Sequence, residues 1–230
     1  MEVYVGTSGW LYDWNEEASL DWYIRESGLN AVELNASFYR FPYRNQVVSW
    51  ARKGRGIRWS IKVHKSITHY RKLGRDALEI WRRFHNLFTP MNDVIDFYLF
   101  QMPPQFTCSK ENLEKIERFH EASNLASRMA VEFRHVSCFN DSVASWGIDK
   151  AIVIVSIDAP IASWITNIMG IVYLRMHGRS SWYGHEYTMD ELREVAGRIV
   201  RMKPEKVYVF FNNDHWMLEN ARSLMGMLRG

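Results

Sequence analysis

Short runs of β-branched and aromatic residues alternate along this chain with longer segments of helical spacing, and this alternation constrains the fold most strongly. Parallel strands need long crossover connections, usually helices, so the pattern predicts repeated βα units. The predicted strands are residues 2–5, 31–34, 58–63, 96–100, 128–133, 150–155, 171–176 and 206–211. The predicted helices are residues 17–28, 44–53, 76–89, 110–126, 189–201 and 215–229, with short or irregular helices after the fifth and sixth strands.

The number of strands and the chain length together predict one α/β domain. Eight strands in this order fit a closed (β/α)8 TIM barrel spanning residues 1–230, and 230 residues is an ordinary length for that fold. A doubly wound open sheet is the alternative fold. We expect Ser109 to cap the helix that follows it, and either Thr188 or Asp190 to cap the helix near residue 190.

The cysteines and the apolar runs bear on the compartment. Neither Cys108 nor Cys138 belongs to a CxxC pair, so no zinc or redox motif is indicated, and Cys138 is expected to be a buried, inert thiol. The N-terminus lacks a signal-peptide pattern, and no apolar run is long enough to span a bilayer. We therefore expect a reduced, cytoplasmic setting, no membrane partner and no obligate protein partner.

Side-chain parity separates charged from apolar residues on four predicted strands. Successive strand residues face opposite sides of a sheet, so Lys62 and His64 share one side of their strand while Ile61 and Val63 share the other. The apolar sides are expected to meet the helices, and the polar sides to point into the barrel near its C-terminal mouth. The other polar sides carry Glu33 and Asn35, Glu132 and Arg134, and Arg175 and His177.

The ends of the predicted strands carry the candidate site residues, because TIM-barrel active sites are built there. Structural ion pairs inside the barrel are the alternative interpretation. Ionised groups in an interior are costly, however, and a barrel can be filled with aliphatic side chains, so we favour a functional cavity. The candidate catalytic residues are Glu33, Lys62, Glu132 and His177. The candidate substrate-binding residues are Trp10, Tyr12, Asn35, Tyr39, His64, His69, Gln101, Arg134, Arg175, Arg179, Tyr183, Asn212, Asn213 and Asp214.

The mixture of cations and glutamates favours an anionic substrate. Lys62, Arg134 and Arg175 would repel a divalent ion, so we predict no multi-metal centre, and the sequence indicates no particular cofactor. Arginine instead offers a planar fork for phosphate or carboxylate, and Glu33 or Glu132 can serve as general base or acid. A glycosidase-like carboxylate pair is also open, because the sequence does not give the separation of the two glutamates.

Two loops are expected to attract the anion. The basic segment 64–75 follows the third predicted strand and lies on the rim of the mouth, although a solvated loop is the usual meaning of such a run. The second location lies between Arg175, the loop 177–184 and residues 211–214, where barrels of this kind often hold phosphate. Asp214 opposes that assignment, since it can cap the last helix instead.

Motifs along nearly the whole chain resemble the family called domain of unknown function 72, or YecE-like proteins. They include GTSGW (6–10), VELNASFYRFP (32–42), IKVHKSITH (61–69), LFQMPPQF (99–106), AVEFRH (130–135), YLRMHGR (173–179) and VFFNND (209–214). The resemblance implies a TIM barrel and no particular reaction. This chain departs from the family pattern at Val136, at Cys138 and in residues 214–221, which changes the mouth near the fifth and eighth strands.

Three functions remain open from the sequence. The first is a hydrolase or lyase that acts on a phosphorylated or nucleic-acid-like anion. The second is a non-catalytic binder of nucleic acid or of a small anion, and the third is a glycosidase-like enzyme. We favour the first, since a neutral sugar needs no arginine or lysine.

Overall fold

The computed structural model describes residues 1–230, which form two compact units. The first unit contains Met1–Glu33, Gly56–Arg58 and Val155–Gly230, and the second contains Leu34–Arg55 and Trp59–Ile154. No helix is long and apolar enough to cross a membrane.

The first unit is a mainly parallel sheet with three helices. Its strand order is β2-β1-β10-β9-β7-β8, and β8 alone runs antiparallel to its neighbour. The strands are β1 (Glu2–Thr7), β2 (Ala31–Leu34, whose last residue belongs to the second unit), β7 (Ser156–Ala159), β8 (Ala162–Trp164), β9 (Ile171–Met176) and β10 (Lys206–Phe211). The helices are α1 (Leu20–Glu26), α6 (Met189–Arg201) and α7 (Met217–Arg229).

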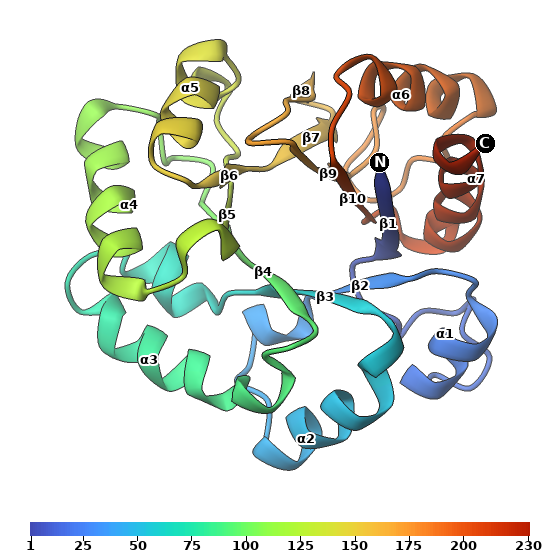
Figure 1. Ribbon diagram of the computed structural model, residues 1–230, viewed down its shortest axis with the longest axis horizontal. Coiled ribbons are helices and arrows are strands. Elements are labelled where there is room, and N and C mark those ends of the chain that lie inside the picture. Colours follow the sequence, from blue (N-terminus) through green and yellow to red (C-terminus); the bar gives the residue numbers. More distant parts are fainter. The chain divides into compact units, whose positions relative to one another are not determined.

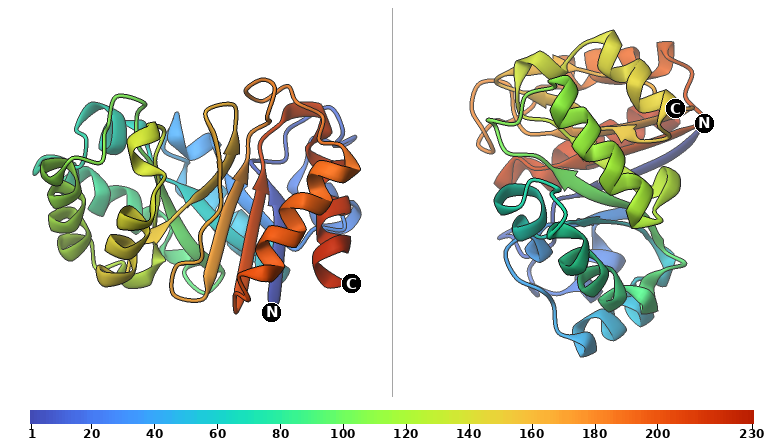
Figure 2. Two further views of the ribbon diagram at one scale, coloured as in Figure 1. Left: turned by 90° about the horizontal axis from the view of Figure 1, so that it is seen from above. Right: turned by 90° about the vertical axis from the view of Figure 1, so that its left-hand side faces the viewer.

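Helix α7 packs against β1 and β10, and α6 packs beside α7, as Figures 1 and 2 show. The apolar positions of α6 recur at helical spacing and are buried: Leu192, Val195 and Ile199. Thr188 caps this helix, and its hydroxyl accepts from the backbone N–H of Glu191, whose carboxylate accepts from the Thr188 backbone in return. The predicted Thr188 cap is therefore confirmed.

Gly6 allows β1 and β2 to approach closely. A Cβ at this position would lie 2.1 Å from the carbonyl oxygen of Ala31, which is a backbone atom and cannot move away. Glycine is thus required where these two strands meet, and the strand that carries Glu33 is held against β1.

The second unit repeats the parallel βα pattern. Its strand order is β3-β4-β5-β6, and all the pairings are parallel. The strands are β3 (Arg58–Lys62, whose first residue belongs to the first unit), β4 (Ile95–Gln101), β5 (Met129–Glu132) and β6 (Val153–Ile154). The helices are α2 (Arg44–Lys53), α3 (Ala77–Leu87), α4 (Lys110–Ser123) and α5 (Asp141–Asp149), and Ser109 caps α4 as expected.

The structure corrects the sixth predicted strand and the start of the last helix. Residues 150–155 are not one strand, because α5 ends at Asp149 and the backbone turns at Ala151, whose φ is 54°, before the short β6. A β7–β8 hairpin replaces a helix after that segment, closed by a turn at residues 160–161. Asp214 begins a 3₁₀ turn with φ 51°, and no side chain caps α7, so the suggested Asp214 cap is wrong.

A disulfide joins Cys108 to Cys138, so the expectation of an inert thiol at Cys138 is wrong. The two Cα atoms lie 5.2 Å apart. Strands β4 and β5 are neighbours, with Gln101 paired to Glu132, and the loops that follow them therefore meet. Sequence spacing alone does not show this neighbourhood, because the cysteines lie 30 residues apart.

We predict that the Cys108→Ser/Cys138→Ser double variant unfolds with a free energy about 2–4 kcal/mol lower than that of the wild type, because the bond restricts the unfolded chain. Urea unfolding monitored by tryptophan fluorescence measures the difference. Reductant should lower the free energy of unfolding of the wild type to that of the variant, and it should leave the value for the variant unchanged. Two free thiols in the denatured, unreduced wild type would contradict the assignment.

Candidate functional site

A buried ion pair at the strand ends is the centre of the first unit. Arg175 on β9 donates from Nη2 to Oε1 of Glu33 on β2 at 2.5 Å, and both side chains have no solvent exposure. Ser8 donates to the same oxygen at 2.7 Å, and the Tyr173 hydroxyl donates to Oε2 at 2.9 Å. Such additional hydrogen bonds offset part of the cost of burying two charges.

His177 extends this network past the end of β9. Its Nε2 lies 3.4 Å from Nη1 of Arg175, and its Nδ1 lies 3.3 Å from the amide nitrogen Nδ2 of Asn212. Arginine only donates, so Nε2 accepts and the proton of a neutral ring sits on Nδ1. The Asn212 carboxamide must then turn its oxygen toward Nδ1, which is an assignment made from the hydrogen-bond network.

The loop after β9 places aromatic rings beside His177. The ring centroids of Trp182 and Tyr183 lie 5.5 Å and 5.9 Å from that of the imidazole. Tyr183 has φ 68° and is 40% exposed, and its backbone N–H donates to the carbonyl oxygen of His177 at 2.8 Å. The Tyr183 ring therefore contacts the imidazole of His177 and is also exposed to solvent.

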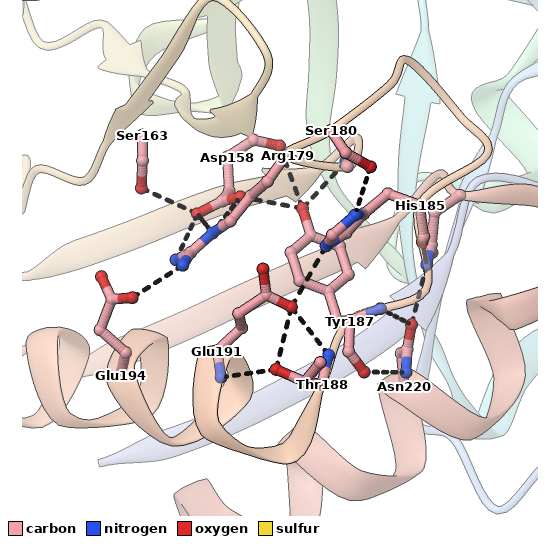
Figure 3. Close-up of polar contacts among 12 residues, drawn as sticks. Asp158, Ser163, Arg179, Ser180, His185, Tyr187, Thr188, Glu191, Glu194 and Asn220 are labelled. Atoms are coloured by element: carbon pink, nitrogen blue, oxygen red, sulfur yellow. Dashed lines mark hydrogen bonds and ion pairs between the residues drawn. The ribbon is translucent and has the colours of Figure 1, made fainter.

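Asp158 on β7 anchors the same loop, as Figure 3 shows. Arg179 contacts both of its carboxylate oxygens at 3.0–3.2 Å and also donates to Glu194 at 2.7 Å. The Tyr187 hydroxyl donates to Asp158 at 3.0 Å and accepts from the backbone N–H of Gly178 at 2.9 Å. Burial, and then the Asp158 carboxylate, raise the pKa of this hydroxyl, so it remains a donor.

This arrangement changes the interpretation of the loop 177–184 as an anion site. Arg179 pairs with both Asp158 and Glu194, and Arg175 pairs with Glu33. Asn213 is buried, and its amide donates to the His185 carbonyl and to Asn220, while Asp214 is exposed. Both arginines are thus paired with carboxylates of the protein itself. Their positive charge therefore gives little reason to expect an anion bound beside the loop 177–184.

The second unit gathers cations at the ends of β3 and β5. Arg134 contacts Oε1 of Glu132 through Nε at 2.6 Å and donates to Oε1 of Gln101 at 3.4 Å. Nζ of Lys62 lies 4.3 Å from the ring centroid of Phe38, over its face. Lys62 and Arg134 are 5% and 8% exposed, so their charges act in a poorly hydrated environment.

The His69 imidazole lies close enough to these cations for their charges to lower its pKa. Its ring packs edge-on against Phe38 at 4.9 Å, and Thr68 bonds its Nδ1 at 2.9 Å. Burial lowers its pKa to about 4, with further lowering by the charges of Lys62, Arg134 and Lys65 in that order. The charges of these three cations all oppose protonation of the ring, so the imidazole is neutral at pH 7.

The remaining candidate residues have various surroundings. His64 bonds the hydroxyl of Ser66 through Nδ1 at 2.7 Å, and burial lowers its pKa. The Asn35 side-chain oxygen is buried without a hydrogen-bond partner, whereas Tyr39 is 64% exposed. Trp10 is buried, and the Tyr12 hydroxyl donates to the Ser8 carbonyl at 3.3 Å.

The structure therefore groups the predicted residues into two sets. Within the first unit it brings together Glu33, Arg175, His177, Asn212 and Tyr183, and within the second Lys62, His69, Gln101, Glu132 and Arg134. That all the charged residues converge on one cavity stays a prediction. Sequence reasoning did not single out Ser8 or Tyr173 as contributors, although Tyr173 shares its parity with Arg175 and was open to the same argument.

No group of three or more His, Cys, Asp or Glu side chains is arranged to hold a metal ion. The arginine partners described above occupy both candidate glutamates. The expected absence of a multi-metal centre stays a prediction, which elemental analysis of the purified protein addresses.

Comparisons with known proteins identify the family and the fold. The family model described as "Protein of unknown function DUF72" matches residues 4–230. The crystal structure of a DUF72 family protein from Thermotoga maritima MSB8 matches this chain with a TM-score of 0.85. The two sequences are 27% identical, and the match covers 100% of each chain. Another from Enterococcus faecalis V583 is 19% identical, with a TM-score of 0.82, covering 99% of this chain and 96% of that chain.

More distant structures are sugar epimerases. A crystal structure of D-psicose 3-epimerase with D-tagatose from Clostridium cellulolyticum H10 is 13% identical, with a TM-score of 0.57, covering 100% of this chain and 98% of that chain. No curated protein sequence matches the chain. The expected α/β fold of the TIM-barrel type is thereby confirmed, as is the family resemblance.

We predict that Arg175→Met lowers the free energy of unfolding by about 3–5 kcal/mol, because it leaves the Glu33 carboxylate buried without its arginine. Adding Glu33→Gln should recover part of the loss. Arg193→Met, which breaks the exposed pair with Asp190, is the control and should have little effect. Chemical denaturation measures all four proteins, and equal stabilities of the Arg175 and Arg193 variants would contradict the role of the buried pair.

Proposed function

Because the chain belongs to the DUF72 family and has a TIM-barrel-like fold, we propose that it is an enzyme, a hydrolase or lyase acting on a phosphorylated or nucleic-acid-like anion. The active sites of TIM-barrel enzymes lie at the carboxyl ends of the strands, where this chain carries its buried charges. The fold alone does not select a reaction, so the proposal depends on the chemistry of these residues.

The observation that carries the proposal is the position of buried Lys62 and Arg134 beside His69. Buried Lys62 and Arg134, together with Lys65, lower the pKa of this ring to about 4, and burial contributes most. Charges in a low-dielectric environment act strongly on a ligand as well as on a neighbouring side chain. A phosphate group placed beside Lys62 and Arg134 would gain charge-assisted hydrogen bonds from both.

The residues of each unit have distinct proposed roles. In the second unit, Lys62 and Arg134 bind the anion, Glu132 positions Arg134, and neutral His69 accepts a proton. In the first unit, Glu33 positions Arg175, and Arg175 lies against Nε2 of His177. Asn212 and Tyr183 orient that imidazole or cover it.

The two alternatives are less well supported. A glycosidase needs two carboxyl groups that exchange protons with substrate or attack it, whereas Glu33 and Glu132 are each engaged by an arginine. A non-catalytic anion binder uses the same cations and differs in showing no turnover. The cytoplasmic location and the absence of an obligate protein partner stay predictions.

We predict that sulfate, whose charge is constant between pH 4 and 7, raises the pKa of His69 above its value of about 4 in the unbound protein. A bound anion stabilises the imidazolium, and by linkage sulfate should bind more tightly as the pH falls from about 6.5 toward 4. Imidazole C–H resonances followed by NMR measure the pKa, and His69→Gln assigns them.

Two variants separate a specific site from general attraction. Lys62→Met should weaken sulfate binding and raise the pKa of His69 without ligand, because a cation that acts on the ring is removed. Lys53→Met, at the exposed end of α2, is the matched control. If sulfate leaves the His69 resonances unmoved, or if both variants behave alike, the anion site is wrong.

Turnover distinguishes the enzyme from the binder. Sugar phosphates and short oligonucleotides are the substrates to test, with phosphate release and strand cleavage as readouts. An enzyme should lose its activity in the His69→Gln or Lys62→Met variant and keep it in Lys53→Met. Tight binding without any turnover would favour the non-catalytic alternative.

A further inference from the structure

Three exposed tyrosines lie on two neighbouring segments of the second unit. Tyr39, Tyr43 and Tyr70 are 64%, 65% and 66% exposed. Nζ of Lys65 lies 5.8 Å from the ring centroid of Tyr39 and 5.9 Å from that of Tyr70. The Lys65 ammonium group thus lies near two solvent-exposed rings. We call Tyr39, Lys65 and Tyr70 the tyrosine–lysine surface.

Buried aromatic contacts hold the two segments together beneath this surface. Phe38 packs against His69 at 4.9 Å, and Phe41 packs against His64 at 4.8 Å. The turn Ser66–Tyr70 is fixed by its buried residues Ile67 and Thr68. The exposed rings are therefore carried by an ordered base, which reduces the entropy that a ligand must remove on binding.

The two segments carry positive charge without carboxylates. Residues 39–44 contain Arg40 and Arg44, and residues 64–75 contain Lys65, Arg71, Lys72 and Arg75, with no Asp or Glu in either segment. The guanidinium of Arg40 lies 5.8 Å from the ring of Tyr43, which repeats the pairing of a cation with an exposed ring. Exposed aromatic side chains grouped in this way indicate an interaction site.

Cations alternating with exposed rings match the chemistry of a single nucleic-acid strand. Unpaired bases stack on aromatic side chains, while the phosphates between them contact lysine and arginine. A duplex hides its base faces, so rings that project from a surface gain little from it. We propose that the tyrosine–lysine surface binds single-stranded nucleic acid, with bases stacked on Tyr39 and Tyr70 and phosphates near Lys65 and Arg71.

The surface is continuous with the cationic group of the same unit. Tyr39 contacts Phe38 edge-on at 5.0 Å. The Phe38 ring also contacts Nζ of Lys62 and the ring of His69. A strand stacked on Tyr39 would therefore present its phosphates to Lys62 and His69. In this respect the inference rests on the proposed function and narrows its substrate to a single-stranded polynucleotide.

Fluorescence anisotropy of a short labelled oligothymidylate, at about 50 mM salt, tests the proposal. The Tyr39→Leu/Tyr70→Leu variant should bind at least tenfold more weakly, since each lost stacking interaction is worth about 1–3 kcal/mol, while Tyr39→Phe/Tyr70→Phe should keep the affinity. Lys65→Met/Arg71→Met should also reduce the salt dependence of binding. Trp216→Leu, at an exposed ring of the first unit, is the control and should bind like the wild type.

Several results would overturn the inference. They are no binding of the oligonucleotide by the wild type, equal binding by the leucine variant, or equal or tighter binding of a duplex of the same length. Binding of anionic lipid vesicles or of a phosphopeptide in place of the oligonucleotide would also overturn it.

The sulfate titration of His69 separates this inference from the proposed function. If sulfate raises the pKa of His69 but the oligonucleotide does not bind, the surface is wrong and the anion site stands. If the oligonucleotide binds through the tyrosines while sulfate leaves His69 unchanged, the surface stands and the proposed anion site is wrong.

Discussion

The arrangement of the first unit depends on the buried ion pair between Glu33 and Arg175. Burying two charges costs several kcal/mol per ion, and only good geometry with further hydrogen bonds offsets that cost. Ser8 and Tyr173 supply those bonds, so the ends of β1, β2 and β9 are fixed to one another. His177 depends on the same pair, because Arg175 determines which of its ring nitrogens accepts.

The second unit also pairs an arginine with a buried carboxylate, Arg134 with Glu132, and it adds Lys62 and Lys65. Its cations act on His69, and the packing of Phe38 connects that ring to Lys62 and to the exposed Tyr39. Cations in a poorly hydrated place are unfavourable for the free protein and favourable for binding an anion, which is the usual compromise between stability and function at a site. We therefore propose that this group recognises an anion, and that Glu33 and Arg175 have a mainly organising role.

The sequence predicted most elements and the residue types at the strand ends. The alternation of apolar and charged residues placed Arg175 with His177 and Lys62 with His64, because strand parity is a local property. It did not show that Arg179 serves Asp158, nor that Cys108 meets Cys138, since both facts depend on which loops become neighbours. The β7–β8 hairpin was missed because periodicity does not distinguish a short apolar strand from a short buried helix.

Anomalous diffraction tests the central claim most directly, which is that the buried cations of the second unit bind an anion. Crystals grown with selenate, a heavier analogue of sulfate, would locate the bound oxyanion without assumptions about the reaction. The account predicts a selenium peak within hydrogen-bond distance of both Lys62 and Arg134, beside His69. Peaks confined to exposed lysines, or found only at Arg179 in the loop after β9, would contradict it.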